Sequence, residues 1–295
     1  MTTCGNTIVK NSVLTVLPTV GTISIHALKK GKQLRLDKKE YLLIPYQFVS
    51  FLVGLIDGVG YIQIAKTSKG FIAVRMVIGL SLEDLSTLEY IHSVLKLGKI
   101  RIYRDHLNPN CKLIINKTDI QEVLFPLLIH HNIFFLTKTR KEQFDLAMHI
   151  FKNNLKSYSD IPNVNNIYSS FKLPNTASDY LKLGFFKNWL VGFTNVEASF
   201  FIKKNKDGCF QLKQRIHVQL FEAFKLLFET KRKISFEKNI FVQFSVCSKS
   251  EIQKVINFFS FSGLHPLIGL KSIQYFKWLS DLQNSYRYKN LNFPK

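Results

Sequence analysis

The chain has 295 residues, of which 46% are hydrophobic, and it carries 41 lysines and arginines against 20 aspartates and glutamates. This length and hydrophobic content exclude a mainly disordered chain and allow one large domain or two of ordinary size. A net charge of +21 is too basic for a typical small-molecule enzyme. It favours a polyanionic partner, with nucleic acid ahead of a membrane surface, but identifies no chemistry.

Cysteine spacing and hydropathy narrow the class further. Cys4, Cys111, Cys209 and Cys247 are far apart and form no CxxC pair, so neither a zinc site nor a disulfide framework is supported. We expect structural thiols in a reducing compartment. The most apolar run, 123–136, is interrupted by polar residues and is too short to span a bilayer, so no membrane partner is expected.

The N-terminal segment differs from the rest of the chain. Residues 1–31 contain no acid and are rich in serine and threonine, a composition typical of mitochondrial presequences. We interpret residues 1–37 as a basic, loosely packed N-terminal arm preceding the folded part.

Hydrophobic periodicity predicts a regular order of elements in the first half of the chain. The helix 47–56 is followed by strands at 61–64 and 71–80, a helix at 82–97, strands at 98–103 and 111–116, and helices at 118–128 and 144–151. We expect Thr118 to cap its helix with Gln121 as the capping partner.

The same order returns after a polar stretch that contains Pro162 and Pro174. Predicted elements are a helix at 185–194, strands at 200–204 and 210–220, a helix at 221–230, strands at 233–236 and 240–246, and helices at 250–259 and 272–282. We therefore predict an α+β protein with two pseudo-symmetric αββαββα halves, 38–153 and 185–295, joined by a linker at 154–184.

Two apolar motifs open the two halves. The first reads LVGLIDGVG over 52–60 and the second LVGFTNVEA over 190–198. Neither has a polar face before its end, so neither is a surface helix. Gly54 and Gly192 occupy the third position of each motif, where a small residue lets two helices approach closely. The pattern predicts that the helices pack together and bring their ends side by side.

These motifs resemble those of single-chain, two-motif LAGLIDADG proteins, the family of homing endonucleases and group I intron maturases. The resemblance covers Asp37 to Lys295, and the linker, the second motif and the segment 270–279 are most similar to fungal mitochondrial intron-encoded members. It implies two sheets that form a saddle in the major groove of a nucleic acid. It also implies a monomer with an internal pseudo-dimer, located in the mitochondrial matrix.

The resemblance also implies a chemistry and a defect in it. Family members cleave DNA with divalent metals, and oxygen ligands there suit Mg²⁺. The metal-binding acid is the eighth letter of the motif, which is Glu197 in the second copy but Val59 in the first. Asp57 is the nearest alternative ligand, although the family uses that letter structurally. Arg140 and Lys271 match the basic residues that the family places near the attacking water.

One predicted strand carries a candidate nucleic-acid surface. Over 209–219, glutamine, lysine, arginine and histidine alternate with apolar residues, and Gln214 interrupts the apolar series. Such side chains read base edges from a half-buried sheet. The predicted nucleic-acid contacts are Gln63, Lys66, Arg75, Arg101, Lys203, Gln211, Lys213, Arg215 and His217.

Three functions fit these observations. The first is a maturase that aids group I intron splicing, with endonuclease activity impaired or lost. The second is an active or nicking Mg²⁺-dependent DNA homing endonuclease, which Val59 disfavours. The third is a LAGLIDADG fold recruited as a structural RNA-binding subunit, such as a mitochondrial ribosomal protein. The sequence does not separate the first from the third, because both need only shape-directed phosphate contacts.

Overall fold

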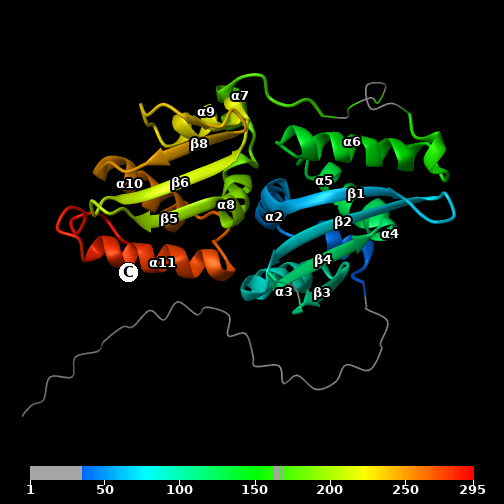
Figure 1. The fold of residues 1–295 in the computed structure, drawn as a ribbon, viewed down its shortest axis with the longest axis horizontal. Helices are drawn as coiled ribbons and strands as arrows, with labels where there is room; N and C mark the ends of the chain where they lie inside the picture. Colours follow the sequence, from blue (N-terminus) through cyan, green and yellow to red (C-terminus); the bar gives the residue numbers. More distant parts are fainter. Residues whose placement is uncertain (1–34, 106, 163–166, 168, 170) are drawn as a thin grey trace, which may run out of the picture. The chain divides into compact units, whose positions relative to one another are not determined.

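Each half of the chain builds a four-stranded antiparallel sheet next to one buried helix (Figure 1). The computed structural model describes residues 35–105, 107–162, 167, 169 and 171–295. Most of the predicted N-terminal arm, residues 1–34, lies outside the described residues. Within the described ranges, no helix is both long and apolar enough to cross a membrane.

The first half follows the predicted order of elements. It comprises α1 (Lys38–Leu42), α2 (Tyr46–Val59), β1 (Gly60–Lys66), β2 (Ile72–Ser81), a 3₁₀ turn (Leu82–Asp84), α3 (Leu85–Leu95), β3 (Lys99–Tyr103), β4 (Asn110–Asn116), α4 (Lys117–Asp119), a π-helical turn (Ile120–Leu124), α5 (Phe125–His130) and α6 (Lys138–Lys152). The strand order in the sheet is β1-β2-β4-β3.

The second half repeats this order. After a 3₁₀ turn (Tyr158–Asp160) and α7 (Ala177–Lys182) come α8 (Phe186–Glu197), β5 (Ala198–Ile202), β6 (Gly208–Arg215), α9 (Val218–Leu227), β7 (Ser235–Glu237), β8 (Phe241–Val246), α10 (Lys249–Ile256), a π-helical turn (Asn257–Phe261) and α11 (Gly269–Gln283). The strand order β5-β6-β8-β7 matches that of the first sheet. The predicted α+β fold with two αββαββα halves is confirmed.

Two local predictions were wrong. The helix after β4 begins at Lys117, because Asn116 rather than Thr118 caps it and accepts a hydrogen bond from the Asp119 N–H. The strand predicted over 210–220 ends at Arg215, and α9 begins at Val218.

The early end of β6 has a physical reason. Alternation of apolar and polar residues continues to Gln219, but the buried residues Leu220, Phe221, Ala223 and Phe224 follow a helical period. Only a helix brings all four to the core. Val218 and Ile216, which the strand pattern placed on an apolar face, are each 39% exposed.

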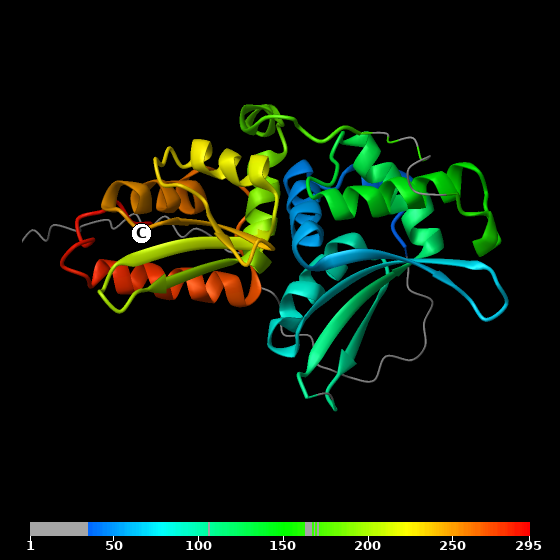
Figure 2. The same cartoon turned by 45° about the horizontal axis from the view of Figure 1, so that its top comes forward.

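The two motif helices α2 and α8 lie side by side at the centre of the described structure (Figures 1 and 2). Close approach requires both motif glycines. A Cβ atom on Gly54 would fall inside the backbone carbonyl of Trp189, and one on Gly192 would fall inside that of Phe51. The reciprocal contacts confirm that the two motifs pack against each other as a pseudo-twofold pair.

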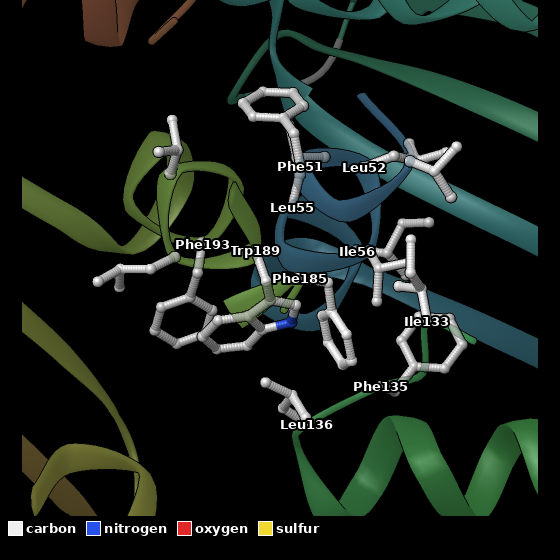
Figure 3. Close-up of a cluster of buried hydrophobic side chains, with 14 of the residues drawn as sticks. Phe51, Leu52, Leu55, Ile56, Ile133, Phe135, Leu136, Phe185, Trp189 and Phe193 are labelled. Atoms are coloured by element: carbon white, nitrogen blue, oxygen red, sulfur yellow. The ribbon is translucent and has the colours of Figure 1, made fainter. Parts of the chain in front are cut away.

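Aromatic and aliphatic side chains fill the space around this helix pair (Figure 3). Phe51 from α2 and Trp189 from α8 are fully buried, as is Phe135 from the segment before α6. Burial of each large side chain contributes roughly 1.5–3 kcal/mol. The ends of the motif helices are therefore held in a fixed geometry.

Candidate nucleic-acid interface and nuclease site

The last residues of the two motif helices are the centre of the candidate site. α2 ends at Val59 and α8 ends at Glu197, and each is followed directly by the first strand of its sheet. Gly58 lies against the second motif, since a Cβ atom there would meet Val196 and lie 3.1 Å from the Glu197 Cγ. The predicted juxtaposition of the two motif ends is thus present.

Glu197 occupies a polar pocket of about 410 Å³. The pocket is lined by Asp57, Gly58, Thr137, Thr139, Arg140, Glu197, Gln214, Arg215 and His217. Gln214 accepts a 2.7 Å hydrogen bond from the Arg215 N–H on its Oε1 and hydrogen-bonds to the Glu197 carboxylate with its side chain. The carboxylate, the amide and the Arg140 guanidinium therefore converge on one cavity.

Burial dominates the electrostatics of this pocket. It raises the pKa of Glu197 to about 7, and the Gln214 hydrogen bond, Lys271 and Arg140 oppose that rise. Burial also lowers the pKa of Arg140, against the attraction of Asp57 and Glu197. A carboxyl group poised near neutrality in a cleft is typical of functional sites.

A larger pocket of about 800 Å³ lies at the other motif end. It is lined by Val59, Gly79, Leu80, Ser81, Asp84, Asn108, Pro109, Asn110, Lys112, Asn195, Val196, Leu270, Lys271 and Gln274. We call it the Val59 pocket, and the cavity around Glu197 the Glu197 pocket. The Val59 pocket contains Lys271 but no acid from a motif helix.

Strand register shows that the two pockets are pseudo-symmetric counterparts. Gly60, the residue after Val59, pairs with Ile78, and Ala198, the residue after Glu197, pairs with Leu212. Two residues further along each second strand stand Leu80 and Gln214. Each lines the pocket of its own half. The Val59 pocket therefore differs from its counterpart at two positions, with Val59 and Leu80 where the Glu197 pocket has a carboxylate and an amide.

Asp57 is a structural residue in this arrangement. It is 2% exposed and accepts four hydrogen bonds: from the Leu136 N–H (2.7 Å), the Thr137 N–H (3.2 Å), the Thr137 hydroxyl (2.5 Å) and the Trp189 Nε1–H (2.8 Å). Burial raises its pKa to about 6 while these bonds oppose the rise. With its lone pairs occupied, the geometry does not favour Asp57 as a metal ligand.

We expect Asp57→Asn to lower the free energy of unfolding by about 2–3 kcal/mol, because an amide NH₂ group would face donors that now have an acceptor. Urea denaturation followed by circular dichroism measures the change. Asp281→Asn, an exposed position on α11, is the matched control, with an expected change within about 0.5 kcal/mol. Equal stability of both variants would contradict the anchoring role.

The two predicted basic residues occupy equivalent positions. Arg140 and Lys271 lie in the first turns of α6 and α11, and each has a glutamine three residues later. The Arg140 Nη1–H approaches the Gln143 Oε1 (3.4 Å), which also accepts from the Ile62 N–H (3.0 Å). Lys271 donates to the Ala198 carbonyl and to the Gln274 Oε1. Arg140 lines the Glu197 pocket and Lys271 the Val59 pocket.

The predicted nucleic-acid residues fall largely on one face of each sheet. Cross-strand pairs place Gln63 opposite Arg75 and Arg101 opposite Lys112 in the first sheet. In the second sheet, Gln211, Lys213 and Arg215 alternate with core residues of β6.

Four of the predicted contacts lie outside the regular outer face of a strand or already have a protein partner. Lys66 lies on the face of β1 that carries the buried residues, since it pairs with Ile72 across the sheet. Lys203 follows β5, and its ammonium hydrogen-bonds to the Cys247 thiol. Lys213 forms an ion pair with Glu237 at 2.6 Å. His217 stands at the N-cap position of α9 instead of lying in the strand, and burial lowers its pKa.

Comparisons with known proteins agree with this architecture. The family model described as LAGLIDADG endonuclease matches residues 52–150. "Probable intron-encoded endonuclease aI3" of Dictyostelium discoideum is 24% identical over 248 residues, which are 83% of this chain and 99% of that protein. A protein of the same name from Kluyveromyces lactis is 25% identical over 258 residues, which are 77% of this chain and 63% of that protein.

Solved structures share the fold. I-SmaMI bound to an uncleaved DNA target with calcium ions superimposes with a TM-score of 0.58 at 18% identity, covering 80% of this chain and 90% of that one. The I-LtrWI LAGLIDADG homing endonuclease bound to target DNA gives 0.60 at 22% identity, covering 81% and 88%. The chain is therefore similar to LAGLIDADG proteins in its first motif-containing half and in its fold.

Sequence reasoning missed one polar residue of the Glu197 pocket. Gln214 was visible only as a polar break in an apolar series, and its contact with Glu197 required the fold. Its counterpart Leu80 gave no signal, because a leucine in an apolar strand is unremarkable there. The equivalence of Leu80 and Gln214 follows only from the strand registers of the two sheets.

The donor sets of the two pockets suit different roles. Mg²⁺ prefers oxygen ligands and keeps waters beside one or two carboxylates, and the Glu197 pocket offers a carboxylate and an amide. In the Val59 pocket, Val59 and Leu80 offer no ligand atom. Among the described residues, no group of three or more histidine, cysteine, aspartate or glutamate side chains is placed to hold a metal ion by itself.

Proposed function

We propose that this LAGLIDADG protein binds structured nucleic acid through its two sheet faces, aids the splicing of a group I intron in the mitochondrial matrix, and makes no coordinated double-strand break. One observation carries the proposal: the Glu197 pocket is polar, whereas its counterpart has Val59 and Leu80 in place of a carboxylate and an amide. The fold and the basic surface are retained where one half of the catalytic apparatus is lost.

Energetics support a severe loss at the Val59 pocket. Removing one preorganised electrostatic group from an active site typically costs roughly 3 kcal/mol of transition-state stabilisation, which is about two decades in rate. Two such groups are missing on one side. Cleavage of both strands requires both pockets, so the slower pocket limits double-strand cutting.

The names of the relatives, the positive charge and the N-terminal composition support an intron-encoded, nucleic-acid-binding function in mitochondria. The curated relatives are named intron-encoded endonucleases, and the solved structures of similar fold include DNA complexes. The formal charge of +21 suits either nucleic acid. The acid-free N-terminal composition supports the mitochondrial location.

Co-purification followed by a splicing assay tests this function. We expect the chain to enrich a transcript that contains a group I intron and to accelerate its splicing at low Mg²⁺. Recovery of stoichiometric ribosomal RNA without an intron transcript would instead support a structural ribosomal subunit. Linearisation of a target plasmid by the native chain would contradict the loss of double-strand cutting.

A second candidate function is strand-specific nicking, and the convergence of Glu197, Gln214 and Arg140 favours it. Glu197 would hold Mg²⁺ together with waters and phosphate oxygens, and the ion would activate the attacking water. Gln214 fixes the orientation of the carboxylate, and Arg140 supplies positive charge beside the phosphate. Conversion of supercoiled plasmid to open circles without linear product is the diagnostic result.

The pH dependence of nicking follows from Glu197. A metal-binding carboxylate must be ionised, and burial raises the pKa of Glu197 to about 7. At subsaturating Mg²⁺ we expect the nicking rate to fall about tenfold per pH unit below about pH 7 and to level off above it. In Gln214→Leu, the Glu197 carboxylate loses the hydrogen bond that stabilises its ionised form. We therefore expect the pH at which the nicking rate levels off to be higher in this variant. A flat profile from pH 5.5 to 8.5 would contradict this role of Glu197.

A further inference from the structure

Two buried thiols of the second sheet lie apart from the residues that line the Glu197 and Val59 pockets. Cys209 is the second residue of β6, and Cys247 is the first residue after β8. The two residues are 0% and 2% exposed, and their Sγ atoms lie 3.2 Å apart, within hydrogen-bond distance. The second sheet therefore holds two reduced sulfur atoms in direct contact.

Strand register shows that the two cysteines stand opposite each other. β6 and β8 are antiparallel neighbours (Figure 1), and Phe210 pairs with Val246. The next position along the two strands is Cys209 on one and Cys247 on the other. Opposite residues of an antiparallel pair have Cα atoms about 4.5–5.5 Å apart, inside the range of about 4.4–6.8 Å that a disulfide spans. A bond between the two sulfur atoms therefore requires no movement of the strands.

Positively charged side chains lie beside this thiol pair. Lys203 follows β5, and its ammonium donates a hydrogen bond to the Cys247 sulfur. Arg232, in the segment before β7, adds a second positive charge that acts on Cys209. An adjacent cation stabilises a thiolate, which is the reactive form of cysteine.

The two thiols are suited to different steps of an oxidation. Burial raises the pKa of Cys209 to about 12, and the hydrogen bond with Cys247 adds to the rise. Cys209 therefore stays protonated, whereas Cys247 is the thiol that Lys203 contacts. A thiolate beside a second thiol is the arrangement in which an attacking cysteine is followed by a resolving one.

The position of the pair at the end of the sheet decides which reagents reach it. Lys203 and Cys247 each stand one residue beyond the end of a strand, where local opening costs less free energy than in the middle of a sheet. Lys203 is itself only half-buried. A small oxidant such as a hydroperoxide is therefore favoured over a bulky disulfide.

We propose that Cys209 and Cys247 form a dithiol site that reacts with a hydroperoxide and closes into a cross-strand disulfide. The Cys247 thiolate attacks one peroxide oxygen, so that an S–O bond forms, the O–O bond breaks, and the leaving hydroxide takes up the proton that Cys247 released. Cys209 then attacks the Cys247 sulfur, the S–S bond forms, the S–O bond breaks, and the second hydroxide leaves as water with the Cys209 proton. Two thiols reduce one hydrogen peroxide to two waters. This chemistry is independent of the proposed nucleic-acid function.

The disulfide would join residues that are 38 positions apart in the chain, so that the closed loop contains α9, β7 and β8. A cross-link of this kind stabilises a protein mainly by restricting the unfolded chain. We expect the oxidised protein to melt about 5–10 °C above the reduced protein. Oxidation thus makes the second sheet harder to unfold.

Peroxide treatment of the full chain in a Cys4→Ser/Cys111→Ser background tests the site. A serine at position 111 keeps a donor for the Leu80 and Ser81 carbonyls that the Cys111 thiol now contacts. We expect both remaining thiols to be lost together, a linked peptide to appear in mass spectrometry without reduction, and dithiothreitol to reverse both changes. If the background variant does not fold, mapping the same peptides in the native chain gives the same readout.

Matched variants assign the roles of the three residues. Cys209→Ser should stop at a sulfenic acid on Cys247, which dimedone traps, and should gain no melting temperature on oxidation. Lys203→Met should slow the loss of thiols about tenfold, because the thiolate loses its cation. Lys204→Met, a change at the exposed neighbouring position, should leave the rate within about twofold. Thermal denaturation of each reduced variant confirms folding.

The contrary outcomes are equally distinct. Retention of both thiols under conditions that oxidise the urea-unfolded chain would overturn the site, as would disulfides that form only between molecules. Equal oxidation rates in Lys203→Met and Lys204→Met would overturn the part assigned to Lys203. A chain that binds no nucleic acid but forms the disulfide would overturn the proposed function and leave this site intact.

Discussion

Val59→Glu together with Leu80→Gln is expected to restore double-strand cleavage, whereas Val59→Glu alone leaves cleavage at the Val59 pocket slow. In the Glu197 pocket, Gln214 orients the carboxylate and stabilises its ionised form. A glutamate at position 59 next to Leu80 would lack that hydrogen bond and would sit against an aliphatic side chain, where burial raises a carboxyl pKa. The double variant supplies both groups beside Lys271.

The expected gain is large. Each restored group contributes roughly two decades in rate, so the double variant should produce linear plasmid at least about a hundredfold faster than Val59→Glu. Single-turnover assays on plasmid with a selected target site measure nicked and linear product separately. In a Glu197→Gln background, the double variant should nick only the opposite strand. Equal linearisation by Val59→Glu and the double variant would show that Leu80 is not a second lesion.

Replacement of either motif glycine should cause the largest loss of stability. A Cβ atom at Gly54 or Gly192 would overlap a backbone carbonyl of the opposite helix, and a backbone group cannot rotate away as a side chain does. Overpacking of a core costs about 1–3 kcal/mol and at times more, and we expect about 3 kcal/mol for each alanine variant. For a chain of this size, that lowers the melting temperature by about 6–12 °C.

Gly79→Ala is the matched control, because a Cβ atom there would lie 3.7 Å from the Lys112 Cγ, an ordinary contact. Its melting temperature should differ from the native value by less than about 2 °C. The double variant Gly54→Ala/Gly192→Ala should lose less free energy of unfolding than the sum of the two single variants. Once one alanine has pushed the two helices apart, the Cβ atom of the other alanine no longer overlaps the opposite backbone. Unchanged melting of the single variants would contradict the close helix pair.

The differences between the Val59 pocket and the Glu197 pocket were only partly predictable. Val59 was recognised from the motif because its counterpart Glu197 stands at the same letter. Leu80 was not, because leucine fits an apolar strand and its equivalence to Gln214 depends on which residues pair across each sheet. Asp57 shows the opposite case: the nearest acid in sequence proved to be an anchor for Leu136, Thr137 and Trp189.

The ends of the strands and helices were likewise only partly predictable from the sequence. The alternation over 210–215 correctly predicted the exposed face of β6, but the pattern ran on to Gln219 while the chain turned into α9. Local alternation cannot report that Leu220, Phe221 and Phe224 are needed in the core, because that need arises from elements distant in sequence. Likewise, the capping role of Asn116 depended on where α4 began.

By itself, the sequence determined the two-fold repeat, the pairing of the motif helices and the net positive charge, because these follow from composition, spacing and the absence of a polar helix face. Only the tertiary structure decided which groups meet at the motif ends: Gln214 beside Glu197, Leu80 beside Val59, and Asn195 in the pocket that Lys271 also lines. The reason is physical. Helix and strand periods are local properties of the chain, whereas a pocket is formed by side chains from segments that only packing brings together.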